Sequence, residues 1–245
     1  MTQRPIVAVT MGDPAGIGPE VAAKALAQHD LAACCRPVLV GDAAVLQHAL
    51  QLVGSDLALD IIADVRAARF QPGACATLDL QYVELAALEP GKISADSGLA
   101  SSAYVKLATE LAIEREVDAI ATGPINKAAW SEAGIPHIGH TEILATLTGR
   151  DAPASRVTTM LATPQLRVVH VTRHVPLGEV AALITRDRVL DTIRTTHQGL
   201  IQMGIPEPRL AVAAVNPHGG DGGLVGREEI EEIAPAVQAA RRAGI

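Results

Sequence analysis

Ile6-Val7-Ala8-Val9-Thr10 is the stretch that decides the fold, and Met11-Gly12-Asp13-Pro14-Ala15-Gly16-Ile17-Gly18-Pro19-Glu20 follows it at once. A continuous apolar run of this kind is typical of a parallel strand that is covered on both faces. Pro19 and Glu20 are typical of the first turn of a helix. The glycine spacing matches neither the dinucleotide fingerprint nor the P-loop, so the turn is either structural or an anion site.

The same order of elements recurs further along the chain. Pro37 to Val40 is a second apolar run, and a helix through about Val53 follows it. A helix from Gly98 to about Glu116 precedes a third run, Ala119 to Thr122. Two strands near Val157 to Ala162 and Leu166 to Val171 suggest a hairpin. Strands that alternate with helices predict an α/β fold with a parallel sheet, whose ligands bind at the carboxyl ends of the strands.

Composition excludes several classes of partner. The chain of 245 residues has a formal charge of -7 and only 2% aromatic residues, which argues against nucleic acid as the main partner. No run approaches the ~20 apolar residues of a membrane helix. Cys34, Cys35 and Cys75 fit no metal-binding spacing and are expected to be reduced. We therefore expect a cytoplasmic protein that binds neither nucleic acid nor membrane.

Two motifs in the middle of the chain suit an anion. Lys127 lies just past the predicted strand Ala119 to Thr122, behind Gly123-Pro124. His140 and Thr141 precede a helix from about Ile143 to Leu147, which Thr141 could cap. A lone lysine or histidine at such a place is more often an ordinary surface or structural residue. The hypothesis of a phosphate or carboxylate site therefore requires the three to act together.

The glycine-rich stretch Val215-Asn216-Pro217-His218-Gly219-Gly220-Asp221-Gly222-Gly223 is a second candidate site. The apolar run Leu210 to Val215 predicts a strand before it, and a helix is expected from Arg227. His174 also follows a predicted strand. Two imidazoles and the Asp221 carboxylate would supply part of a divalent metal site. Hydride transfer from a metal-held hydroxyl and hydrolysis by metal-bound water are both open to such a site.

Five motifs together carry a family resemblance: Thr10 to Glu20, Thr122 to Lys127, Gly139 to Glu142, Thr172 to Leu177 and Asn216 to Gly220. In this order they resemble the 4-hydroxythreonine-4-phosphate dehydrogenase family of pyridoxal phosphate biosynthesis. The resemblance implies two α/β/α domains around a cleft, similar to isocitrate and isopropylmalate dehydrogenases. Residues 1–245 would then be one family unit of two interleaved subdomains, in a homodimer with the active site at its interface.

The resemblance also implies an activity. The family oxidises an alcohol β to a carboxylate with NAD or NADP and then releases carbon dioxide, using a divalent metal such as Zn, Mg, Co or Mn. By motif, His174 and His218 correspond to metal ligands, and His140 and Thr141 to substrate-binding residues. We expect His140, Lys127 and Asp221 to be the catalytic groups.

Departures from the family pattern leave alternatives open. The third metal histidine of the family lies in a Tyr-His-Asp-Gln-Gly-like motif that this sequence lacks, which suggests a truncated chain that binds metal weakly and is inactive. Gly219-Gly220-Asp221 resembles paralogous branches that act on D-threonate or D-erythronate 4-phosphate, or on aromatic cis-dihydrodiol dicarboxylates. The other readings are a non-catalytic phosphometabolite-binding protein and a metal-dependent hydrolase.

Overall fold

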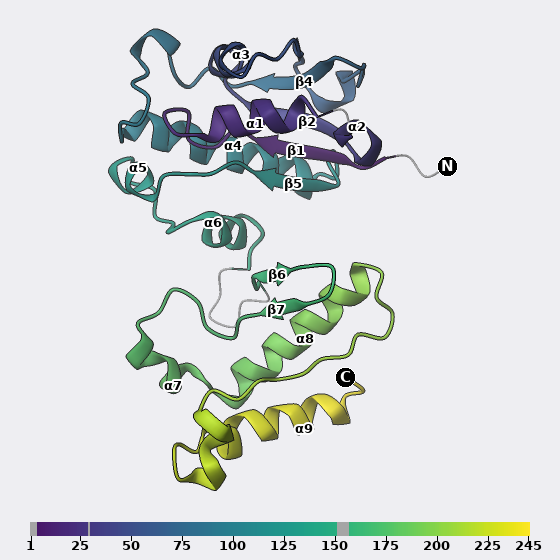
Figure 1. Ribbon diagram of the computed structural model, residues 1–245, viewed down its shortest axis with the longest axis vertical. Coiled ribbons are helices and arrows are strands. Elements are labelled where there is room, and N and C mark those ends of the chain that lie inside the picture. The colour runs from purple at the N-terminus through teal and green to yellow at the C-terminus, as the bar shows by residue number, and fades with distance from the viewer. Residues whose placement is uncertain (1–3, 29, 151–156) are drawn as a thin grey trace. The chain divides into compact units, whose positions relative to one another are not determined.

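The computed structural model describes residues 4–28, 30–150 and 157–245. The chain separates into two compact units, Met1–Thr148 and Gly149–Ile245, and each is considered by itself (Figure 1). Among the residues described, no helix has both the length and the apolar character needed to cross a bilayer.

The first unit contains a five-stranded parallel sheet in the order β3-β4-β2-β1-β5. The central strand β2 is buried over its last four residues, because neighbours pair with it on both edges and helices cover it. This confirms the α/β class and the three apolar strands expected from the sequence. The strands are β1 (Ile6–Thr10), β2 (Arg36–Gly41), β3 (Ala58–Ile61), β4 (Ala74–Asp79) and β5 (Ala119–Thr122).

Helices pack on this sheet and on one another. Helix α1 packs against α3, whereas α4 packs against β1, β2 and β5. The core between them is almost entirely aliphatic, and Tyr104 of α4 is its largest aromatic side chain. The helices are α1 (Gly18–Leu26), α2 (Leu31–Cys34), α3 (Ala43–Leu52), α4 (Ala95–Ile113), α5 (Lys127–Glu132) and α6 (His140–Leu147), with short 3-10 turns η1 (Val65–Ala67) and η2 (Leu85–Ala87).

The direction of strand addition reverses between β1 and β5. From β1 the chain proceeds to β2 on one side, while β5 returns to the other side of β1. A reversal of this kind opens a crevice at the carboxyl ends of the two strands, where ligands bind in α/β sheets. The loops after β1 and β5 meet there, since the Asp13 amide donates to the Pro124 carbonyl at 2.9 Å.

Gly12 makes this close approach possible. Its φ is +80°, and a Cβ at this position would lie 2.4 Å from the Pro124 carbonyl oxygen. Glycine avoids both the left-handed penalty and the collision. The glycine-rich turn that opens the sequence is therefore needed to bring two strand ends together.

The second unit is built on a smaller core. Strands β6 (Met160–Ala162) and β7 (Arg167–Val169) form an antiparallel hairpin, as expected. Helix α8 (Arg186–Gln202) packs on α9 (Ala234–Arg242), and both contribute to one apolar cluster. The remaining elements are η3 (Leu177–Glu179), α7 (Val180–Leu183), η4 (Pro217–Gly223) and η5 (Glu229–Ile233).

One prediction for this unit is wrong. The run Leu210 to Val215 is not a strand, and most of it is exposed, because it pairs with no other strand in the described part of the chain. The final helix begins near Arg227, as expected, with Glu228 as its first helical residue. It passes through a single π-helical turn, η5, before α9, which has Pro235 in its first turn. Proline lacks the amide that a continuous α-helix would need there.

Replacing Gly12 by alanine should destabilise the protein more than the same change at an open glycine. We expect Gly12→Ala to lower the free energy of unfolding by roughly 3 kcal/mol or more, because the Cβ penalty adds to a backbone collision. Gly54 has a φ of +67° but nothing within 4 Å of its added Cβ. Gly54→Ala should therefore cost only about 1–2 kcal/mol. Urea unfolding of both variants measures the difference, and equal losses would contradict the packing argument.

Candidate functional site

The loop between β1 and α1 presents a buried carboxyl group. Asp13 is 3% exposed, and its Oδ1 accepts the Ala15 amide at 2.9 Å. Burial raises the pKa of Asp13, while the amides of Ala15 and Gly16 act in the opposite direction. The Gly91 amide also donates to the Ala15 carbonyl at 2.7 Å, so the loop is fixed from two sides.

Lys127 is the first residue of α5, directly after the crevice. The Asn126 side chain caps the helix, because its Oδ1 accepts the amides of Ala128 and Ala129 at 2.9 and 3.2 Å. The helix is held against α4 by Trp130, which is fully buried and donates from Nε1 to Ser101 Oγ at 2.9 Å. The position of Lys127 is therefore set by the core and not by a flexible loop.

His140 lies beside the same strand end. Its ring meets the Trp130 ring edge to face, with centroids 6.1 Å apart. Burial lowers the pKa of His140. The Gly123 carbonyl and the Glu142 carboxylate raise this pKa, but by less. Its Nε2 atom is buried and has no hydrogen-bond partner among the described residues. A neutral imidazole with an unsatisfied nitrogen is suited to hydrogen-bond a ligand.

The Lys127 side chain lies near Gly139, the residue before His140. A Cβ added to Gly139 would lie 3.8 Å from Lys127 Cε and 3.6 Å from Glu142 Oε2, so these side chains meet over the residue before His140. Lys127, His140 and Thr141 all belong to the first unit, and their joint action on one ligand stays a prediction. Thr141, however, does not cap α6. The N-cap is Gly139, and Thr141 lies inside the first turn, where a backbone amide is free for a ligand.

The predicted metal ligands belong to the second unit. His174 lies five residues past the end of β7, with a φ of +51°. His218 has a φ of +53° and opens a run of six residues with positive φ, which ends at Gly223 and includes Asp221 at +45°. A left-handed conformation costs a non-glycine residue roughly 1–2 kcal/mol, so three such residues store strain. All three side chains belong to exposed residues.

Glu228 and Glu229 hold the start of this loop. One Glu229 oxygen accepts the amides of Val215 and Asn216 at 2.9 and 2.7 Å, and the other accepts Asn216 Nδ2 at 2.9 Å. These bonds lower the pKa of Glu229 to about 2, and the bond from the Asn216 side chain contributes most. Glu228 accepts a further bond from Asn216 Nδ2 at 2.6 Å. The Glu229 carboxylate thus satisfies two backbone amides that a neighbouring strand could otherwise bind.

The described residues do not complete a metal site on their own. No group of three or more His, Cys, Asp or Glu side chains among them gathers closely enough to hold a cation. His174, His218 and Asp221 therefore do not form a three-ligand set here. Two imidazoles remain suitable donors for a divalent cation, but they provide only part of its coordination.

Sequence reasoning missed several supporting residues. Trp130 is the single tryptophan of the chain, yet its contact with His140 depends on the packing of α4, α5 and α6. The contacts of Glu228 and Glu229 with Asn216 were also not predicted. The signal that could have identified their role is an asparagine directly before the glycine-rich loop.

Comparisons with known proteins agree with one another. Residues 33–245 match the family described as pyridoxal phosphate biosynthetic protein PdxA. A protein of Symbiobacterium thermophilum, provisionally named D-threonate 4-phosphate dehydrogenase, is 47% identical over 244 residues, which are 100% of this chain and 72% of that protein.

Two solved structures resemble the chain. A 4-hydroxythreonine-4-phosphate dehydrogenase from Burkholderia phymatum has a TM-score of 0.87 and 41% identity over 100% of this chain and 73% of that one. A terephthalate 1,2-cis-dihydrodiol dehydrogenase from Burkholderia xenovorans LB400 has a TM-score of 0.65 and 32% identity, over 99% of this chain and 72% of that one.

The titration of His140 should reveal its burial. We expect an imidazole pKa below the ordinary value of about 6.5, measured by NMR. As the pH falls, the unfolded chain takes up the His140 proton before the folded protein does. The free energy of unfolding should therefore fall between the His140 pKa of the unfolded chain and the lower pKa of the folded protein. His140→Gln should remove that part of the pH dependence. An unshifted pKa would mean that the ring is solvated.

The Glu229 contacts should control the order of the loop that carries His218. Glu229→Gln removes the charge that its amide partners favour, so the Val215 and Asn216 amides should exchange with deuterium faster. Glu231→Gln is the matched control, because the Glu231 carboxylate bonds Arg227 instead. Exchange that is equally fast in both variants would show that the loop does not depend on Glu229.

Proposed function

The chain belongs to the family described as pyridoxal phosphate biosynthetic protein PdxA, and on that premise we propose that it is a dehydrogenase acting on a small phosphorylated hydroxy acid. The observation that carries the proposal is the buried Nε2 of His140 without a hydrogen-bond partner among the described residues, at the start of α6. Lys127 opens α5 after β5, and a cation and an imidazole donor that share this part of the fold suit a phosphate or carboxylate.

The site residues have separate tasks in this proposal. Lys127 neutralises the anionic group of the substrate, and the first turn of α6, with Thr141, donates hydrogen bonds to it. His140 is neutral, because burial lowers its pKa, and holds or moves a proton at Nε2. Asp221 is assigned to the reacting end, on the loop that the Glu229 carboxylate holds.

The cofactors are proposed from the family. NAD or NADP would accept a hydride from the alcohol, and decarboxylation of the resulting keto acid would follow. A divalent cation, when bound, supplies positive charge that stabilises negative charge on the oxygen of the alcohol. His174 and His218 would hold it in part. We also propose that the protein is a cytoplasmic homodimer, which rests on resemblance and composition alone.

The substrate class is narrowed by the relatives. The S. thermophilum relative at 47% identity is named for D-threonate 4-phosphate, whereas the B. xenovorans structure named for a dihydrodiol is 32% identical. We therefore favour a phosphorylated four-carbon acid. A phosphometabolite-binding protein without catalysis is the alternative, and the incomplete ligand set supports it.

The test is an assay of NADH or NADPH formation with a divalent metal and each candidate substrate: D-threonate and D-erythronate 4-phosphate, 4-hydroxythreonine 4-phosphate and a cis-dihydrodiol dicarboxylate. Turnover should require a phosphorylated acid and should stop with a chelator.

Lys127→Ala should lower kcat/KM by roughly 10-fold or more through loss of the charged contact. Lys106→Ala, on the exposed face of α4, is the control and should leave it unchanged.

Metal binding is followed independently by Co²⁺ absorption. His174→Ala and His218→Ala should each weaken Co²⁺ binding by more than the 10–100-fold typical of an outer-shell change. Substrate binding without turnover would favour the non-catalytic alternative, and turnover that survives the chelator would refute the metal requirement.

A further inference from the structure

The first unit has a large cavity far from the Lys127 and His140 pair. Its volume is about 670 Å³, and it lies at the amino ends of the strands, between Arg4 before β1, Arg36 at the start of β2 and Cys75 at the start of β4. The candidate substrate site lies at the carboxyl ends, which is the opposite edge of the same sheet. A volume of this size is in the range of small-molecule sites.

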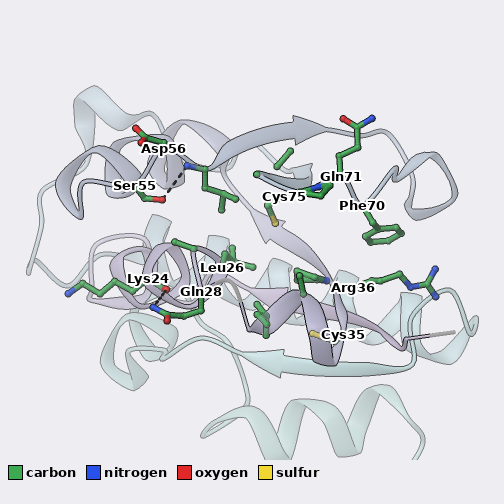
Figure 2. A pocket seen from close by; sticks show the side chains of 18 of the residues that line it. Lys24, Leu26, Gln28, Cys35, Arg36, Ser55, Asp56, Phe70, Gln71 and Cys75 are labelled. Atoms are coloured by element: carbon green, nitrogen blue, oxygen red, sulfur yellow. Dashed lines mark hydrogen bonds between the residues drawn. The ribbon is translucent and has the colours of Figure 1, made fainter. Parts of the chain in front are cut away.

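The walls of the cavity are mainly apolar. Leu31 and Leu57 line it together with Phe70, and all three are partly buried against the main core. Figure 2 shows the Cys75 side chain between the segments that enclose the cavity. Such walls favour a ligand with an apolar body.

The charges at the cavity are unusual for this chain. Three cations line it, Arg4, Lys24 and Arg36, against one carboxylate, Asp56, so the lining carries a net charge of +2 in a chain of net charge -7. None of the three cations forms an ion pair among the described residues. Unpaired cations around an apolar pocket complement an anion.

Arg36 is held in place for such a contact. Its Nε donates to the Arg4 carbonyl at 2.8 Å. Its guanidinium carbon lies 5.1 Å from the centroid of the Phe70 ring, and Figure 2 shows these two side chains near each other. A guanidinium that is fixed on one edge keeps its other N–H groups for a ligand. Because Arg36 also covers Phe70, its charge lies directly beside the apolar wall.

We propose that this cavity is a second ligand site, which binds a small organic anion with an apolar body. Its anionic group contacts Arg36, with Arg4 nearby, and its apolar body lies on Leu31, Leu57 and Phe70. A phosphorylated sugar acid has no apolar body, so the ligand of this site differs in class from the proposed substrate. The inference does not depend on the proposed function.

The probe for this site is 8-anilinonaphthalene-1-sulfonate, and its neutral counterpart is N-phenyl-1-naphthylamine, which lacks the sulfonate. Calorimetry should give an affinity at least tenfold higher for the sulfonate. Arg36→Gln should reduce the affinity for the sulfonate to that of the neutral compound. Equal affinities in the unmodified protein, or no effect of Arg36→Gln, would overturn the proposal.

Two neighbouring alanines provide a matched pair. Ala32 lines the cavity and is exposed, whereas Ala33, also exposed on α2, does not line it. Ala32→Trp should fill the cavity and weaken sulfonate binding at least tenfold, and Ala33→Trp should not. If the two variants bind alike, or if D-threonate 4-phosphate displaces the probe, the probe binds elsewhere and the proposal fails.

A measurement on the unmodified protein covers the case in which a variant does not fold. Cys35 lines the cavity, while the adjacent Cys34 is exposed and does not. The sulfonate should slow the alkylation of Cys35 by iodoacetamide at least fivefold and leave Cys34 unaffected, as followed by tandem mass spectrometry. Equal protection of both thiols, or of neither, would overturn the assignment.

Discussion

The close contact between the loops that follow β1 and β5 is the constraint on which the first unit depends. Neither loop has room for a side chain at the point of contact, since a Cβ at Gly12 or Gly123 would lie within 2.6 Å of a backbone oxygen of the other loop. The Asp13 amide and the Pro124 carbonyl bond across it. Because α5 and α6 both continue from this junction, the positions of Lys127 and His140 follow from a packing requirement of the sheet.

The sequence predicted this unit well because its signals are local. Three apolar runs, each followed by a helix or a turn with glycine or proline, correspond to β1, β2 and β5 within one or two residues. The placement of Lys127 and His140 after the same strand end was predicted from their order in the chain. The contact of His140 with Trp130 was not predicted, since it requires the packing of three helices.

The sequence predicted the second unit less well, because its loops depend on contacts between residues far apart in the chain. Leu210 to Val215 has the composition of a strand, but a strand needs a partner, and composition does not reveal one. The amides that a partner would have satisfied are bound partly by Glu229, which is 13 or 14 residues away. The glycines after His218 suggest a left-handed backbone. His218 and Asp221 adopt this backbone too, although they lack the conformational freedom of glycine. Whether His174 and His218 share a cation stays a prediction.

Trp130 gives the protein an internal optical reporter. The chain has one tryptophan, and that residue is fully buried with its ring against His140. Tryptophan emission from this molecule therefore originates at a single residue, which contacts His140, the proposed ligand of the anion. Occupation or protonation events at that edge of the sheet can be followed in the native protein without a dye or an introduced label.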